Sequence, residues 1–221
     1  MIREKIVVTN LFYKKAEPFI LYALSDLIAN KRALRLILSP TINSSSDPTV
    51  KGIECNGFYC GKGKEFGMAM KKPVKEWFSV FVHEYCHFLQ HREKFKPFMK
   101  MEITDKNFPN WDLWLAGERE YGEEKLKYAF KTIQDVEWDC ERRVLELIDK
   151  HSLPIDPLHY AREANSYVMF YSVALRLRRW YVKEPYKIKA ICDRLSTKLY
   201  TLEEMYNPPV WFIEEIQKYC F

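Results

Sequence analysis

The segment from Trp77 to His91 constrains the fold more than any other, because its residues are apolar on nearly every side of a helix. A helix of that kind belongs in a protein core rather than on a surface. At 100° per residue, its polar side chains fall in one sector of roughly 120°. Polar groups in a core are unfavourable unless they find partners. The segment therefore predicts a buried helix with a polar site on one face. The members of the sector are His83, Glu84, His87, Gln90 and His91.

The predicted elements change in kind along the chain. Helical periodicity marks residues 16–31, alternation marks a strand at 33–39, and glycines divide residues 50–70 into strand-like runs that predict hairpins. Later patterns are helical and follow one another without a clear linker. We therefore predict an α+β fold in one domain over residues 1–221, with a small N-terminal sheet and a mainly helical C-terminal half. The predicted later helices are 73–93, 122–149, 156–181, 186–199 and 209–219, with an irregular stretch at 95–112.

The composition predicts an ordered cytoplasmic protein. Aromatic residues make up 15% of the chain and apolar residues 48%, which argues against disorder. No stretch of about 18 apolar residues is present, so no membrane span or membrane partner is expected. The N-terminus lacks the pattern of a secretory signal. The net charge of +5 permits a nucleic-acid partner without demanding one.

Six cysteines are present, and without a secretion signal they are expected to be free thiols. Cys55 and Cys60 have the spacing of half a structural zinc site, but no second pair with suitable spacing follows. Cys86 lies inside the polar segment, yet it points about 60° away from His83 on a helical wheel. We therefore expect Cys86 to be a packed thiol rather than a ligand.

His83 and His87 are four residues apart, so they lie on one face of a helix and can bind the same metal ion. Glu84 lies next to them and can reach a water molecule held by that ion. These residues predict one catalytic zinc ion, with Glu84 as the general base that activates the water. The alternative is a pair of core histidines with ordinary hydrogen bonds. The neighbouring Glu84 and the apolar flanks favour the metal.

A catalytic zinc ion usually has three protein ligands, and the third is expected from the segment around residues 134–148. Glu137 and Glu141 fall on its apolar stripe, where carboxylates need a cation or hydrogen bonds. We predict Glu137 as the third ligand and Glu141 as the residue that orients one histidine. The reverse assignment stays open, and Glu118 is a weaker competitor. In the alternative, these glutamates pair with nearby arginines: Arg119, Arg142 or Arg143.

These residues resemble the zincin metallopeptidases, whose HExxH pattern with uncharged flanks is similar to the segment from Val80 to Leu89. The pair Glu137 and Glu141 resembles the third-ligand helix of the gluzincin branch. Two departures weaken the match: the second acidic residue there is usually Asp, and 50 residues between His87 and Glu137 is a long spacing. The whole chain is also similar to uncharacterised zincin-like proteins of tailed bacteriophages. The segments that carry this similarity are HEYCHFLQ, EWDCERR and Ala164 to Tyr167.

The resemblance implies a zinc metallopeptidase that acts on a protein or peptide substrate, in the host cytoplasm if phage-encoded. It implies that residues 63–70 form a strand that aligns the substrate backbone. It also implies a donor that stabilises the oxyanion. We assign that catalytic role to Tyr167, although packing in an aromatic core is the commoner role of such a residue. The other candidates for the donor are Tyr171, His151 and His159.

Two functions compete with the peptidase. The first is a catalytically inactive zincin-fold protein that serves binding or assembly. The second is a nucleic-acid-binding protein that uses the basic and aromatic run at 176–189, where cations alternate with rings. A solvated helix end is the preferred explanation of that run. The substrate and the oligomeric state cannot be derived from the residues.

Overall fold

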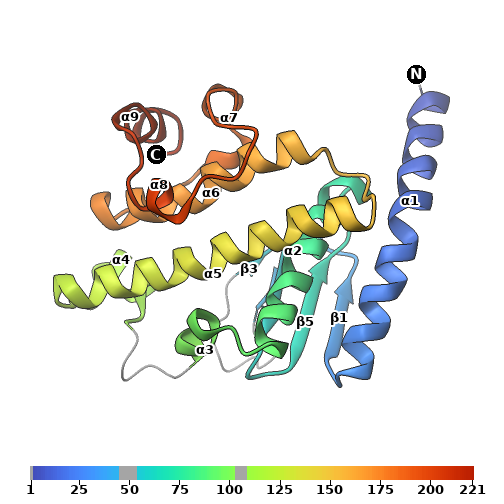
Figure 1. Cartoon of the computed structure of the whole chain (residues 1–221), viewed down its shortest axis with the longest axis horizontal. Coiled ribbons are helices and arrows are strands. Elements are labelled where there is room, and N and C mark those ends of the chain that lie inside the picture. Colours follow the sequence, from blue (N-terminus) through green and yellow to red (C-terminus); the bar gives the residue numbers. More distant parts are fainter. Residues whose placement is uncertain (1, 45–53, 103–108) are drawn as a thin grey trace. The chain divides into compact units, whose positions relative to one another are not determined.

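The computed structural model describes residues 2–44, 54–102 and 109–221 (Figure 1). The chain divides into two compact units. The N-terminal unit comprises Met1–Glu93 with Glu146–Ile155, and the C-terminal unit comprises Lys94–Leu145 with Asp156–Phe221. A small mixed sheet precedes a mainly helical remainder, which confirms the predicted α+β class. The single domain over 1–221 stays a prediction. In the described part, no helix is long and apolar enough to cross a membrane.

Three strands form the sheet of the N-terminal unit, in the order β1-β5-β4. β1 (Ala33–Ile37) runs parallel to β5 (Glu65–Ala69), and β4 (Gly57–Cys60) runs antiparallel to it. The strand at 33–39 and a hairpin within 50–70 are thereby confirmed, while residues 50–53 lie outside the described part. Two further short strands pair with each other: β2 (Ile42–Asn43) and β3 (Glu54–Cys55).

The position of β5 corrects one expectation. Residues 63–70 were expected to align a substrate backbone, yet β5 has β1 on one side and β4 on the other. A central strand has its backbone groups engaged on both edges, so it has none left for a peptide substrate. Its side chains agree with this position, because four successive residues are buried, as in a strand covered on both faces: Phe66, Gly67, Met68 and Ala69.

Helix α2 (Val74–Arg92) is the core helix that the sequence predicts. It begins after Pro73, which suits a helix start because proline has no backbone N–H to satisfy. Helix α1 (Ile2–Ala29) packs against it through Phe19, whose ring meets those of Phe78 and Tyr85 edge-on. Helix α1 is longer than the predicted 16–31. Ten residues of α2 are buried, including Glu84, His87 and Gln90.

The C-terminal unit is helical. The long helices α5 (Glu123–Lys150) and α6 (Pro157–Leu177) confirm the predictions for 122–149 and 156–181. Helix α9 (Val210–Tyr219) confirms the prediction for 209–219. Buried apolar residues of these helices form one core cluster, which includes Phe130, Val168, Met169, Phe212 and Ile216.

Two predictions for this unit are wrong in part. The stretch 95–112 contains α3 (Lys96–Glu102) and α4 (Trp111–Leu115), although residues 103–108 lie outside the described part. The predicted helix 186–199 is reduced to η1 (Pro185–Lys187) and α7 (Lys189–Cys192).

The buried side chain of Asn165 supplies hydrogen bonds where the helix at 186–199 was expected to continue. Its Nδ2 donates to the carbonyls of Ser196 and Lys198, and its Oδ1 accepts from the N–H of Tyr200. These bonds satisfy backbone groups that a helix would otherwise pair. The next helix, α8 (Leu202–Tyr206), was missed, although Thr201 and Glu204 form the capping box that marks its start.

Candidate metal centre

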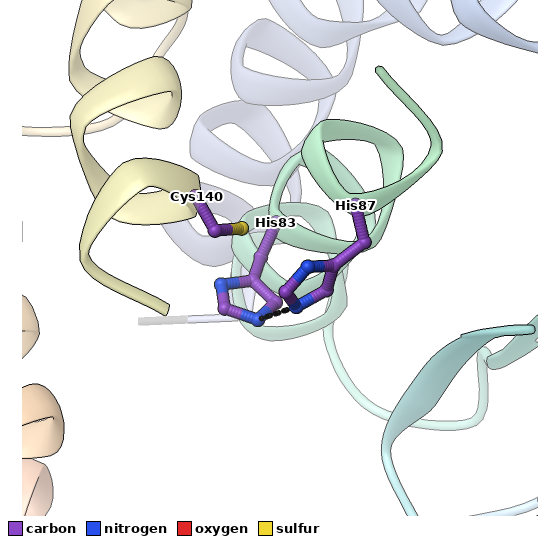
Figure 2. A group of neighbouring side chains, drawn as sticks. All are labelled: His83, His87 and Cys140. Atoms are coloured by element: carbon purple, nitrogen blue, oxygen red, sulfur yellow. Dashed lines mark hydrogen bonds between the residues drawn. The ribbon is translucent and has the colours of Figure 1, made fainter. Parts of the chain in front are cut away.

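Two imidazole rings meet on successive turns of α2, as Figure 2 shows. The Nε2 atoms of His83 and His87 lie 3.1 Å apart, within hydrogen-bond distance. The ring planes are nearly perpendicular, at 89°, and the centroids are 4.7 Å apart. The spacing of four residues therefore brings the two Nε2 atoms together on one face of α2, as the sequence predicts.

Gln90 is the partner of His87 on its other side. The distance from His87 Nδ1 to Gln90 Oε1 is 2.8 Å, and the Gln90 side chain is fully buried. An amide oxygen can only accept, so the proton of this hydrogen bond belongs to Nδ1. His87 Nε2 then carries a lone pair. The sequence placed Gln90 in the polar sector but assigned the orienting role to Glu141.

Glu84 lies beside His83 in the chain and faces the start of β4. Its side chain is 9% exposed. A Cβ atom added at Gly57 would lie 3.2 Å from Glu84 Cγ, so the strand passes close to the carboxylate. Burial, and next the negative charge of Glu84, raise the pKa of the Cys55 thiol to about 11. Glu84 is therefore a buried carboxylate near β3 and β4, and its role as general base stays a prediction.

Gly57 is the residue that lets β4 approach α2, and its replacement by alanine tests this packing. The added Cβ would lie 2.6 Å from Met68 Sδ and 3.0 Å from Val80 Cγ1. Overpacking of this kind usually lowers the free energy of unfolding by about 1–3 kcal/mol. We expect a lower urea midpoint for Gly57→Ala. Gly122→Ala is the matched control, since nothing lies within 4 Å of its added Cβ. Equal midpoints for the two variants would contradict the close approach.

The two glutamates of α5 are buried, as their apolar stripe predicts: Glu137 is 8% and Glu141 4% exposed. Glu141 accepts a hydrogen bond from the hydroxyl of Tyr160. Arg142 and Arg143, which the alternative pairs with these glutamates, form ion pairs with Asp139 at 2.6 and 2.7 Å. Both glutamates belong to the C-terminal unit. Their roles as third ligand and orienting residue stay predictions.

The tyrosines proposed for oxyanion stabilisation, Tyr167 and Tyr171, form a pair on α6. Their hydroxyl oxygens are 2.9 Å apart. Burial, and next the charge of Glu137, raise the pKa of both phenols well above the usual value, so both remain protonated donors at neutral pH. The catalytic role of Tyr167 stays a prediction.

The other residues considered for the oxyanion donor and for the third ligand are His159, His151 and Glu118. His159 is an exposed residue, 3.2 Å from Glu163. His151 belongs to the N-terminal unit, where its ring packs against Phe19 and Tyr22. Glu118, the weaker competitor for the third ligand, is exposed.

Of the residues that the structure describes, one group of three could hold a metal ion through His, Cys, Asp or Glu side chains: His83, His87 and Cys140 (Figure 2). Sequence reasoning missed Cys140 because it weighed Cys55, Cys60 and Cys86 as possible ligands but not Cys140. A signal was present: Cys140 follows Glu137 by three residues, so it shares the same stripe of α5. Thiolate sulfur binds zinc, as carboxylate oxygen does.

The other cysteines do not join a metal group among the described residues. Cys55 donates through its thiol to the carbonyl of Ile42, and Cys60 accepts from the N–H of Gly63. All six cysteines are free thiols, as predicted, and Cys86 is fully buried. Within the described part of the chain, Cys55 and Cys60 therefore have no second ligand pair that would complete a structural zinc site.

Cations of the basic run at 176–189 have partners within the C-terminal unit. Arg178 pairs with Glu120 at 2.5 Å and lies over the ring of Trp114. Lys187 pairs with Glu184, and Lys189 pairs with Asp193. The choice between a solvated helix end and a nucleic-acid surface for this run stays a prediction.

Comparison with known proteins gave no further assignment: no family model, no curated protein and no solved structure matches the chain.

Proposed function

We propose that the chain is a zinc-dependent peptidase that holds one ion through His83, His87 and a ligand from α5. The separation of the two Nε2 atoms carries this proposal. Zinc–nitrogen bonds of about 2.0–2.1 Å at a tetrahedral angle place two nitrogens about 3.3 Å apart. The separation in the structure is 3.1 Å. The pair therefore fits zinc with a change of a few tenths of an ångström, as an estimate from those bond lengths.

The chemistry follows from the residues beside the ion. When bound, zinc supplies Lewis acidity and lowers the pKa of a nearby water molecule. Glu84 takes a proton from the attacking water and returns it to the leaving amine. The hydroxyl of Tyr167 is the proposed hydrogen-bond donor to the developing oxyanion.

The third ligand decides between two functions. We propose Cys140, which completes the group of three, and the sequence favours Glu137, one turn away on α5. Three protein ligands leave a position for water, which a peptidase needs. If Cys140 and Glu137 both bind, four protein ligands close the site. A closed site is structural, and the chain would then be a zinc-stabilised binding or assembly protein.

Metal content and chelation test the proposal together. We expect the purified protein to contain about one zinc ion per chain. It should cleave a pool of quenched fluorogenic peptides, lose that activity with a zinc chelator, and regain it when zinc is returned. Protein that neither contains nor takes up zinc would refute both functions. Zinc without cleavage of any peptide would refute the peptidase and leave the binding protein.

A further inference from the structure

We infer that Gln90 is a positioning residue that fixes the tautomers of His87 and His83, and thereby prepares one of the two nitrogen donors for the metal. This inference rests on the proposed metal site. It does not depend on peptide hydrolysis.

The burial of Gln90 is the first support. Its side chain is fully buried on a helix whose neighbouring residues Tyr85, Cys86 and Phe88 are also fully buried. An amide in such surroundings destabilises the fold unless its hydrogen bonds are made. An apolar residue would pack here without that penalty. The hydrogen bond of 2.8 Å from His87 Nδ1 to Gln90 Oε1 is one such compensating interaction.

The positions of the protons follow from that bond. His87 keeps its proton on Nδ1, because Gln90 Oε1 can only accept. With both rings neutral, His87 Nε2 is then the acceptor, and His83 Nε2 donates the hydrogen bond of 3.1 Å. The two histidines are therefore not equivalent. His87 presents a lone pair in the direction of the site, while His83 presents a proton.

The consequence concerns metal binding. His87 can bind the metal through Nε2 while its proton stays on Nδ1. His83 can bind through the same atom only after its proton moves from Nε2 to Nδ1, which releases no proton overall. Gln90 thus makes His87 the prepared ligand. As a neutral acceptor, it orients the ring without adding negative charge to the site.

The tautomers can be measured directly in metal-free protein labelled with ¹⁵N-histidine. Long-range ¹H–¹⁵N spectra of the wild type should show the proton of His87 on Nδ1 and that of His83 on Nε2. In Gln90→Met the acceptor is gone, so we expect His87 to shift toward the Nε2–H form. Zinc affinity, measured by competition with a chelator, should fall about 10- to 100-fold. Gln90→Glu retains an oxygen acceptor and should keep the Nδ1–H form.

Asn165→Leu is the matched control for loss of a buried amide. Asn165 is also fully buried, and its partners are backbone groups of residues 196–200 in the C-terminal unit. It should lower stability without changing either histidine signal or the zinc affinity. Two results would overturn the inference: a wild-type His87 protonated on Nε2, or a folded Gln90→Met with unchanged tautomers and affinity. The wild-type spectrum decides even if Gln90→Met does not fold. If Gln90→Met changes the tautomers as expected but the wild-type protein cleaves no peptide, the inference stands and only the peptidase is refuted.

Discussion

Glu84→Gln is expected to lower kcat/KM for peptide cleavage by about 10²- to 10⁴-fold, the usual contribution of a general base. Glutamine keeps the shape of the side chain but cannot accept a proton from water at neutral pH. Glu84 is proposed as a base and not as a ligand, so zinc content should stay at about one ion per chain. The two measurements together separate a catalytic loss from a loss of metal.

Glu76→Gln is the control for this experiment. Glu76 is an exposed carboxylate in the first turn of the same helix. Its replacement removes the same charge and should leave both activity and zinc content unchanged. Full activity in Glu84→Gln would show that another group activates the water. Loss of zinc in Glu84→Gln would show that Glu84 is a ligand or holds the histidines in place.

Local patterns in the sequence predicted the helix that carries the site. Spacing alone placed His83 and His87 on one face, and the apolar surroundings predicted that α2 is a core helix. The same reasoning predicted that Glu137 and Glu141 are buried. These successes share a cause. Helical periodicity fixes which side chains share a face, whatever the rest of the chain does.

The missed features depend on contacts between distant parts of the chain. The order of the strands is an example: nothing near residues 63–70 shows that β5 lies between β1 and β4. The loop around Ser196 is another, because its hydrogen bonds come from Asn165, some thirty positions earlier. Helix propensity in residues 186–199 is overridden by these bonds. Local patterns do not contain such information.

The partner of His87 is a different case. Gln90 is three residues away on the same helix, so its proximity was predictable, and it was placed in the polar sector. What the pattern could not supply is the rotamer that brings Oε1 to Nδ1. Glu141 was preferred for the orienting role because it lies one turn after Glu137 on the same apolar stripe, where a carboxylate needs a partner. A neutral amide on the ligand helix itself now competes for that role.

Removal of a metal ligand is expected to have the largest effect on zinc affinity. Apparent zinc-binding energies of about 10–16 kcal/mol, shared among four ligands, amount to roughly 2.5–4 kcal/mol for each. We therefore expect His83→Ala, His87→Ala and Cys140→Ser each to weaken binding by about 10²- to 10³-fold. Competition with a chelator of known affinity measures the change. The control is Cys86→Ser, since Cys86 and Cys140 are both fully buried thiols on core helices. Equal affinities for the two serine variants would exclude Cys140 as a ligand.

X-ray absorption at the zinc edge then assigns the third ligand. Sulfur lies about 2.3 Å from zinc, while nitrogen and oxygen lie at about 2.0–2.2 Å, so one thiolate gives a separate shell. We expect one sulfur in the wild type, none in Cys140→Ser, and a preserved shell with near-normal affinity in Glu137→Gln. If the wild-type spectrum shows no sulfur and Glu137→Gln binds zinc weakly, the third ligand is Glu137. Weak binding by both variants, with sulfur in the wild type, would mean four protein ligands and no place for water. The site would then stabilise a fold, and Glu84 would have no proton to move.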